Sequence, residues 1–151
     1  MSHIYTKLWT HAVLSTKSGR PFILPPLESR LHNFIHEQLL ELQCPSRIIQ
    51  GMPDHVHLLF LQNPVKSMTE IVKKIKGRST FWVNQHKLSA QKFGWETGYA
   101  AFAVSESQVQ RVFDYISNQK DHHTREDFRQ EYFHLVELHG LMAPESSIPA
   151  K

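Results

Sequence analysis

The stretch SRIIQGMPDHVHLLFL, residues 46–61, contains two strand-like runs on either side of a turn. Residues 46–50 form a short run that includes two isoleucines, and residues 55–61 form a longer apolar run, as is typical of strands. Between them, residues 51–54 read Gly-Met-Pro-Asp, a combination that favours a tight turn. The pattern predicts a β-hairpin whose second strand is apolar on both faces, as in a central strand covered on both sides.

The sequence on both sides of this hairpin predicts the remaining elements. Further strands are expected at residues 4–15 and 99–104. Helices are expected at residues 27–42, from Ser67 to about Gln85 with a break near Gly77, from Ser105 onward, and at about 125–138, where Gly140 ends the last one. Two capping boxes mark helix starts, Ser67 with Glu70 and Ser105 with Gln108.

The predicted order is β-α-β-β-α-β, followed by further helices. This order predicts an α+β fold of the ferredoxin-like, split βαβ type, with an antiparallel sheet, helices packed on it and a C-terminal helix that carries a tyrosine. A length of 151 residues suits one domain. We therefore expect a single domain over residues 1–141 and a flexible tail over residues 142–151, which hold two prolines and few apolar side chains.

Composition narrows the class of protein. Hydrophobic residues make up 40% of the chain, which is typical of a folded globular protein. The single cysteine, Cys44, allows no intrachain disulfide, suits a reducing compartment and is interpreted as an inert thiol. The N-terminus lacks the apolar run of a signal peptide, and no stretch reaches the length of about 20 apolar residues that a membrane span needs. These features predict a cytoplasmic protein without a membrane partner.

Positive charge is concentrated in residues 66–92, which hold seven lysines and arginines and one acid, Glu70. The whole chain has a net charge of only +3, so this segment differs from the rest. A basic segment of this kind either faces a polyanion or forms a solvated helix face. The candidate phosphate contacts are two residues of the loop after the first strand and three of the basic helix, Lys17, Arg20, Lys73, Lys76 and Arg78.

Two histidines stand out in the second strand of the hairpin. Side chains two positions apart in a strand point to the same face, so His55 and His57 project side by side. Two neutral imidazoles in that arrangement can chelate one divalent metal ion. The alternative is a pair of hydrogen-bonded structural histidines.

The helix after Ser105 supplies a second chemical group. Tyr115 and Gln119 lie one helical turn apart, on the flank of its apolar face. A metal ion held by His55, His57 and the Gln119 carbonyl would polarise a phosphodiester, and Tyr115 would attack it to form a covalent phosphotyrosine. That linkage conserves the energy of the broken diester, so the step is reversible without ATP. The alternative for Tyr115 is an aromatic side chain at the edge of the core.

Four stretches together resemble the single-tyrosine HUH transposases of the insertion sequence 200/605 group. The first is GMPDHVHLLF at residues 51–60, which contains the His-x-His pair. The others are KGRS at residues 76–79, FGWETGY at residues 93–99 with the following strand, and YISNQKDHH at residues 115–123. The resemblance extends from about Tyr5 to Leu141.

The resemblance implies a role for each matching position. His55 and His57 match the HUH metal ligands, Tyr115 the nucleophile and Gln119 the third ligand. It further implies a transposase that cuts and rejoins single-stranded DNA at hairpin-marked element ends through a 5′-phosphotyrosine, with Mg²⁺ or Mn²⁺. It also implies a homodimer whose protomers share active sites, acting on nucleoid DNA in a bacterial cytoplasm.

Three alternatives stay open. A domesticated relative would process chromosomal palindromes with the same chemistry. A non-catalytic nucleic-acid-binding module on a ferredoxin-like sheet would need exposed aromatic side chains and no tyrosine beside the histidines. A small zinc hydrolase that activates water would prefer a carboxylate or a third histidine to Gln119.

Overall fold

The computed structural model describes residues 3–122 and 127–139. Its strands are β1 (Trp9–Ser15), β2 (Ser46–Met52), β3 (His55–Leu61) and β4 (Ala100–Val104). Its α-helices are α1 (Leu27–Glu41), α2 (Met68–Gln85), α3 (Val109–Ser117), α4 (Gln119–His122) and α5 (Phe128–Leu138). Two short 3₁₀ helices are η1 (Lys17–Gly19) and η2 (Glu106–Gln108).

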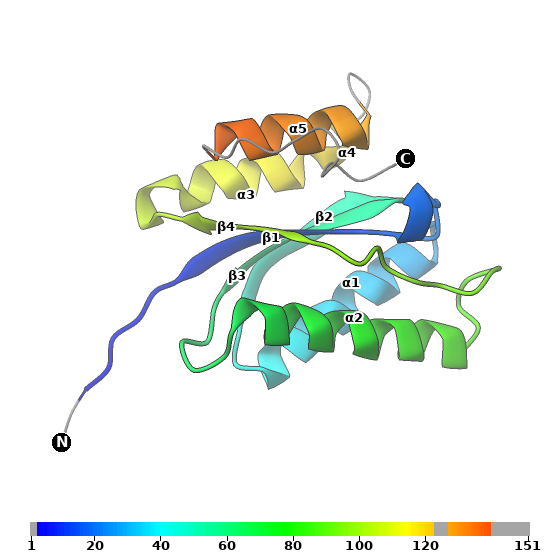
Figure 1. The fold of residues 1–151 in the computed structure, drawn as a ribbon, viewed down its shortest axis with the longest axis horizontal. Coiled ribbons are helices and arrows are strands. Elements are labelled where there is room, and N and C mark those ends of the chain that lie inside the picture. Colours follow the sequence, from blue (N-terminus) through cyan, green and yellow to red (C-terminus); the bar gives the residue numbers. More distant parts are fainter. Residues whose placement is uncertain (1–2, 123–126, 140–151) are drawn as a thin grey trace.

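The four strands form one antiparallel sheet in the order β2-β3-β1-β4. Helices α1 and α2 cover one face of the sheet, and α3 and α5 lie on the other (Figure 1). The α+β, ferredoxin-like architecture predicted from the order of elements is confirmed. No helix in the described ranges is both long and apolar enough to cross a membrane.

Strand β3 is central and buried along nearly its whole length, as the two-sided apolar pattern predicts. Val56, Leu58 and Phe60 point into the larger core cluster, which includes buried side chains of α1 and α2. On the opposite face Leu59 packs with Val109 and other apolar residues of α3. The histidines of β3 share the face of Leu59, so they point into the layer between the sheet and α3–α5.

The predicted hairpin is present, with a longer first strand than expected. Met52 pairs with His55, which leaves only residues 53 and 54 in the turn. Gly51 pairs with Val56, and a Cβ at Gly51 would lie 2.2 Å from the backbone oxygen of His55. Only glycine allows the two strands to approach this closely before the turn.

Two helix starts were predicted from capping boxes, and one is confirmed. The Ser67 side chain accepts a hydrogen bond from the Glu70 backbone N–H at 3.1 Å, so Ser67 caps α2. Ser105 caps nothing with its side chain, because η2 intervenes and α3 begins only at Val109. The predicted break of α2 near Gly77 is wrong, since the helix continues without interruption to Gln85.

The C-terminal helices also differ from the prediction. Asn118 leaves helical geometry, so Tyr115 ends up in α3 and Gln119 begins a separate helix, α4. The last helix begins at Phe128 in the described residues. The expected start near residue 125, His123, the stop at Gly140, and the tail at 142–151 lie outside the described residues.

Candidate metal centre and tyrosine site

Strand β3 places His55 and His57 on the face of the sheet that α3, α4 and α5 cover. Both side chains are fully buried, and their ring centroids lie 5.2 Å apart. The ring of His55 stacks on Phe128 of α5 with a centroid distance of 3.9 Å, which fixes its plane. The two imidazoles predicted to project side by side therefore do so in a buried layer between the sheet and the C-terminal helices.

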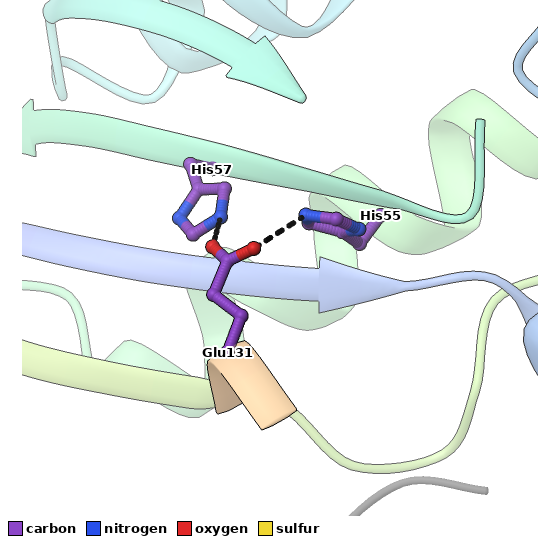
Figure 2. A group of neighbouring side chains, drawn as sticks. All are labelled: His55, His57 and Glu131. Carbon is purple, nitrogen blue, oxygen red and sulfur yellow. Dashed lines mark ion pairs between the residues drawn. The ribbon is translucent and has the colours of Figure 1, made fainter. Parts of the chain in front are cut away.

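The Glu131 carboxylate of α5 lies between the two rings (Figure 2). Its Oε1 is 2.8 Å from His57 Nε2, and its Oε2 is 3.7 Å from His55 Nε2. Glu131 is fully buried, and one ligand atom from each of the three residues lies within 4.8 Å of the others. Two imidazole nitrogens and a carboxylate oxygen at this spacing form a group that could hold a metal ion.

Gln119 and Tyr115 complete this group. Gln119 Oε1 lies 3.0 Å from His55 Nε2, and its amide Nε2 donates to Glu131 Oε1 at 3.0 Å. The Tyr115 hydroxyl donates to the same Glu131 oxygen at 2.6 Å. The four residues predicted from the sequence as ligands and nucleophile, His55, His57, Tyr115 and Gln119, thus meet around Glu131.

The second ring nitrogen of each histidine, Nδ1, also has a partner. His55 Nδ1 lies 2.7 Å from the Asp54 carboxylate, and a carboxylate accepts, so the proton is on Nδ1. The lone pair of His55 Nε2 then faces Gln119 Oε1 and the Glu131 carboxylate, which are acceptors as well. Acceptor atoms that converge on one point suit a cation between them, so the residues present fit a divalent metal ion.

His57 has a corresponding outer partner in His11 of β1. His11 Nε2 lies 2.8 Å from His57 Nδ1, and the two rings are stacked with centroids 5.1 Å apart. Burial lowers the pKa of His11 well below its usual value, and the neighbouring imidazole of His57 lowers it further. His11 is therefore neutral at physiological pH.

A cavity of about 520 Å³ adjoins the group on the side of α3. Tyr115 lines this cavity, together with Arg111 one turn earlier in α3, His11 from β1, and Leu135 and His139 from the α5 region. Tyr115 thus contacts the histidine–glutamate group through its hydroxyl and also lines this cavity.

Three of the five predicted DNA contacts make bonds within the chain. Lys76 Nζ donates to the backbone carbonyls of residues 96–98 at 2.7, 3.1 and 2.7 Å, and burial lowers its pKa. Arg78 lies 3.4 Å from the Glu41 carboxylate, and Arg20 donates to a glutamine of the loop after α2. Lys76 thus ties the loop before β4 to α2, a structural role not anticipated from the sequence.

The other two, Lys17 and Lys73, have no side-chain hydrogen bond or ion pair within the described ranges. Lys17 lines a cleft of about 920 Å³ between α2 and the loop before β4, which also includes Lys92. The aromatic side chain of Phe81 is 69% exposed at this cleft. A basic cleft with an exposed ring has the components of a single-strand binding surface.

Two residues of the site were not found from the sequence. Glu131 stands in the apolar stripe of α5 between Phe128 and Leu135, and a lone carboxylate in such a stripe was the available signal. His11 shares its face of β1 with Val13, so it resembles a core position. The alternation of β1 does show a histidine where an apolar residue is expected, and that was the signal there.

Comparisons with known proteins indicate the family of this chain. The family described as "Transposase IS200 like" matches residues 4–119. The ISDra2 transposase TnpA of Deinococcus radiodurans is 35% identical over 78 residues, which cover 48% of this chain and 56% of that protein, so the match spans about half the length of the relative.

Two solved structures are similar in fold. A crystal structure of a candidate transposase from Deinococcus radiodurans R1 has a TM-score of 0.60 and 25% identity, with 79% of this chain and 95% of that chain covered. A REP-associated tyrosine transposase bound to a REP hairpin has a TM-score of 0.59 and 16% identity, with 95% and 87% covered, and this likeness concerns the fold alone. From the family match over most of its length, this chain belongs to the IS200-like transposase family.

Proposed function

We propose that this protein is a DNA transposase that cuts and rejoins single strands at hairpin-marked element ends, with Tyr115 as the nucleophile. The observation that carries the proposal is the hydrogen bond of 2.6 Å from the Tyr115 hydroxyl to Glu131, in the same buried group as His55 and His57. A tyrosine that merely filled the edge of the core would have no reason to end in a cluster of ligand atoms.

His55, His57, Glu131 and Gln119 are the residues that would hold a divalent ion, Mg²⁺ or Mn²⁺. The atoms that would hold it already lie close together, with His57 Nε2 2.8 Å from Glu131 Oε1 and His55 Nε2 3.0 Å from Gln119 Oε1. The ion would polarise the scissile phosphate and stabilise the charge that develops on it. With three neutral ligands and one carboxylate, the group leaves positive charge for an anionic substrate.

In the proposed reaction, Tyr115 attacks the phosphorus atom and Glu131 accepts the tyrosine proton. The Tyr115 oxygen forms a bond to phosphorus, and the bond from phosphorus to the 3′-oxygen of the departing strand breaks. The hydroxyl proton passes to Glu131 Oε1, its hydrogen-bond acceptor, so Glu131 would hold the ion through its other oxygen, Oε2, and the departing oxygen takes a proton from solvent. The product is a 5′-phosphotyrosine, and a DNA 3′-hydroxyl reverses the step.

The DNA partner is inferred from charge and from the relatives. Lys17 and Lys92 border the basic cleft, and Lys17 follows the end of β1 that pairs with His55. A hairpin is the ligand of one structural neighbour, the REP-associated tyrosine transposase. We propose that hairpin DNA binds this chain too, and that Lys73 is a further phosphate contact. A homodimer with shared active sites remains a prediction, since the Tyr115 hydroxyl bonds here to Glu131 of its own chain.

The test is a denaturing-gel assay for a covalent protein–DNA adduct. Labelled single-stranded hairpin DNA from the flanks of the gene is incubated with Mn²⁺ and wild type, Tyr115→Phe or Tyr99→Phe. Tyr99 is a matched control because it is a partly exposed tyrosine whose hydroxyl bonds to Thr69 of α2. A metal-dependent adduct with wild type and Tyr99→Phe, but not with Tyr115→Phe, supports the proposal.

A binding module is the second candidate, and the exposed ring of Phe81 in the basic cleft favours it. It would shift the hairpin on a native gel and give no adduct with any divalent ion, which would overturn the catalytic proposal. An adduct with chromosomal palindromes, and none with hairpins flanking the gene, would indicate the domesticated alternative.

A further inference from the structure

His11 lies in the middle of the sheet, where the strand pattern calls for an apolar side chain. It is 1% exposed and pairs across the sheet with Leu59 of β3 on one side and Phe102 of β4 on the other. His57 is two residues from Leu59 on the same face, so His11 and His57 are diagonal neighbours across the β1–β3 ladder. This placement explains how a side chain of β1 reaches the outer nitrogen of His57.

We propose that His11 is a positioning residue, which orients His57 for metal binding by accepting a hydrogen bond from its Nδ1. The proposal rests on the metal site described above. To bind a metal through Nε2, His57 must carry its proton on Nδ1. The atom that lies 2.8 Å from Nδ1 is His11 Nε2, so it is the acceptor for that proton.

The pairing has a direct counterpart in the same site. His55 directs Nε2 toward the ligand group and Nδ1 toward Asp54 at 2.7 Å. His57 directs Nε2 toward Glu131 at 2.8 Å and Nδ1 toward His11, also at 2.8 Å. Each candidate ligand therefore has a partner for its Nδ1 atom, the arrangement that fixes the tautomer and the ring plane of metal-bound histidines.

The packing around His11 restricts it to this role. Its ring is surrounded by Phe102, Tyr115 and His139, at centroid distances of 6.0, 6.5 and 6.2 Å. Within residues 3–122 and 127–139, the His11 ring forms its hydrogen bond with His57. The other ring nitrogen of His11, Nδ1, has no partner in those residues. A side chain with one hydrogen bond, directed at one ligand, is placed to position that ligand.

The test compares the Mn²⁺ affinity of wild type, His11→Phe, His11→Gln and His36→Gln, measured by titration calorimetry. Phenylalanine fills a similar volume without an acceptor, whereas the glutamine oxygen can accept from His57 Nδ1. His36 is a matched control, since its ring bonds to Ser46 and lies on the other face of the sheet. Circular dichroism and the metal-free melting temperature check that each variant is folded.

We expect His11→Phe to bind Mn²⁺ about 10- to 100-fold more weakly, as when outer partners of metal ligands are lost. His11→Gln should keep most of the affinity, and His36→Gln all of it. The proposal is overturned if His11→Phe binds as tightly as wild type, or if a folded His11→Gln is as weak as His11→Phe. Absence of Mn²⁺ binding by wild type itself would instead reject the metal site, and this inference with it.

A second measurement needs only the wild-type protein. In ¹⁵N-labelled protein saturated with Mg²⁺, the inference requires His57 to be protonated on Nδ1, with a scalar coupling to His11 Nε2 across the hydrogen bond. A His57 ring protonated on Nε2 in that sample, or a His57 Nδ1 proton without the coupling, contradicts the inference. This readout does not depend on whether His11→Phe folds.

Discussion

Replacing Glu131 by glutamine tests whether this carboxylate is part of a metal site. Glutamine keeps the size of the side chain and an oxygen near His57, but it removes the negative charge of a fully buried group. Affinity for a hard divalent cation depends on the charge of its oxygen ligands, so Glu131→Gln should weaken Mn²⁺ binding.

The size of the effect follows from the position of Glu131 among the ligand atoms. Loss of an outer partner alone costs about 10- to 100-fold in metal affinity, and a direct ligand should cost at least as much. At a Mn²⁺ concentration 100 times the wild-type Kd, binding stabilises the folded wild type by about 2.7 kcal/mol. A tenfold weaker Glu131→Gln would gain about 1.4 kcal/mol at the same concentration.

Thermal unfolding with and without Mn²⁺ measures this difference. For a chain of this length, 1 kcal/mol corresponds to about 2–4 °C in Tm, so Mn²⁺ should raise the wild-type Tm by about 5–11 °C. The Glu131→Gln protein should gain about half of that or less. Each variant is compared with its own metal-free Tm, so any effect of the substitution on the apo protein cancels.

Glu41→Gln is the matched control, because it removes an exposed carboxylate whose partner is Arg78 at 3.4 Å. It should leave the Mn²⁺ shift at the wild-type value. A Glu131→Gln protein that shows the full wild-type shift would refute the assignment of Glu131 to the metal site, whatever its activity on DNA.

Three further predictions use other parts of the chain. Gly51→Ala should lower the free energy of unfolding in urea by about 3 kcal/mol, because its Cβ would lie 2.2 Å from the His55 oxygen. Gly77→Ala, which has open space at the Cβ, should raise it by about 0.5–1 kcal/mol. Equal effects of the two substitutions would contradict the packing described. Burial lowers the pKa of His32 from its usual 6.5, so protons favour the unfolded chain and stability should decline as pH falls below about 6.5. His32→Gln should make that decline shallower. An unchanged pH profile of the free energy of unfolding would contradict this role of His32. Lys17→Ala should reduce the salt dependence of single-strand DNA binding by about 0.7 in log–log slope, the contribution of one phosphate, whereas an unaltered slope would remove Lys17 from the interface.

The elements that the sequence predicts best are those whose signal is local. The bounds of β3 are as predicted, because a short apolar run that begins directly after turn residues is visible within a few positions. The break predicted near Gly77 is wrong because the interactions that keep the helix continuous are not local. The low helix propensity of Gly77 is local, but the buried neighbours Ile75 and Ser79 keep α2 continuous through packing, which propensity does not report.

In the candidate site, too, the residues predicted from the sequence are those with a local signal. His55 and His57 lie two positions apart on one strand, and Tyr115 and Gln119 four apart, so spacing alone suggested that each pair acts together. The break at Asn118 does not separate Tyr115 from Gln119, because both still reach Glu131.

Glu131 and His11 could not be found by spacing. Each belongs to an element far from β3 in the sequence, and its role depends on how that element packs against the histidines. Such a contact is a property of the tertiary structure, and local patterns carry no record of it.

Glu131 lies beyond the residues that match the family. The family match ends at residue 119, before α5 begins, yet α5 supplies the one carboxylate of the histidine group. Substitutions at Glu131 therefore act from outside the matched residues, and they change both the charge of the candidate metal site and the acceptor of the Tyr115 hydroxyl. For engineering, α5 therefore couples two properties, because a change of charge at residue 131 acts on metal preference and on the nucleophile together.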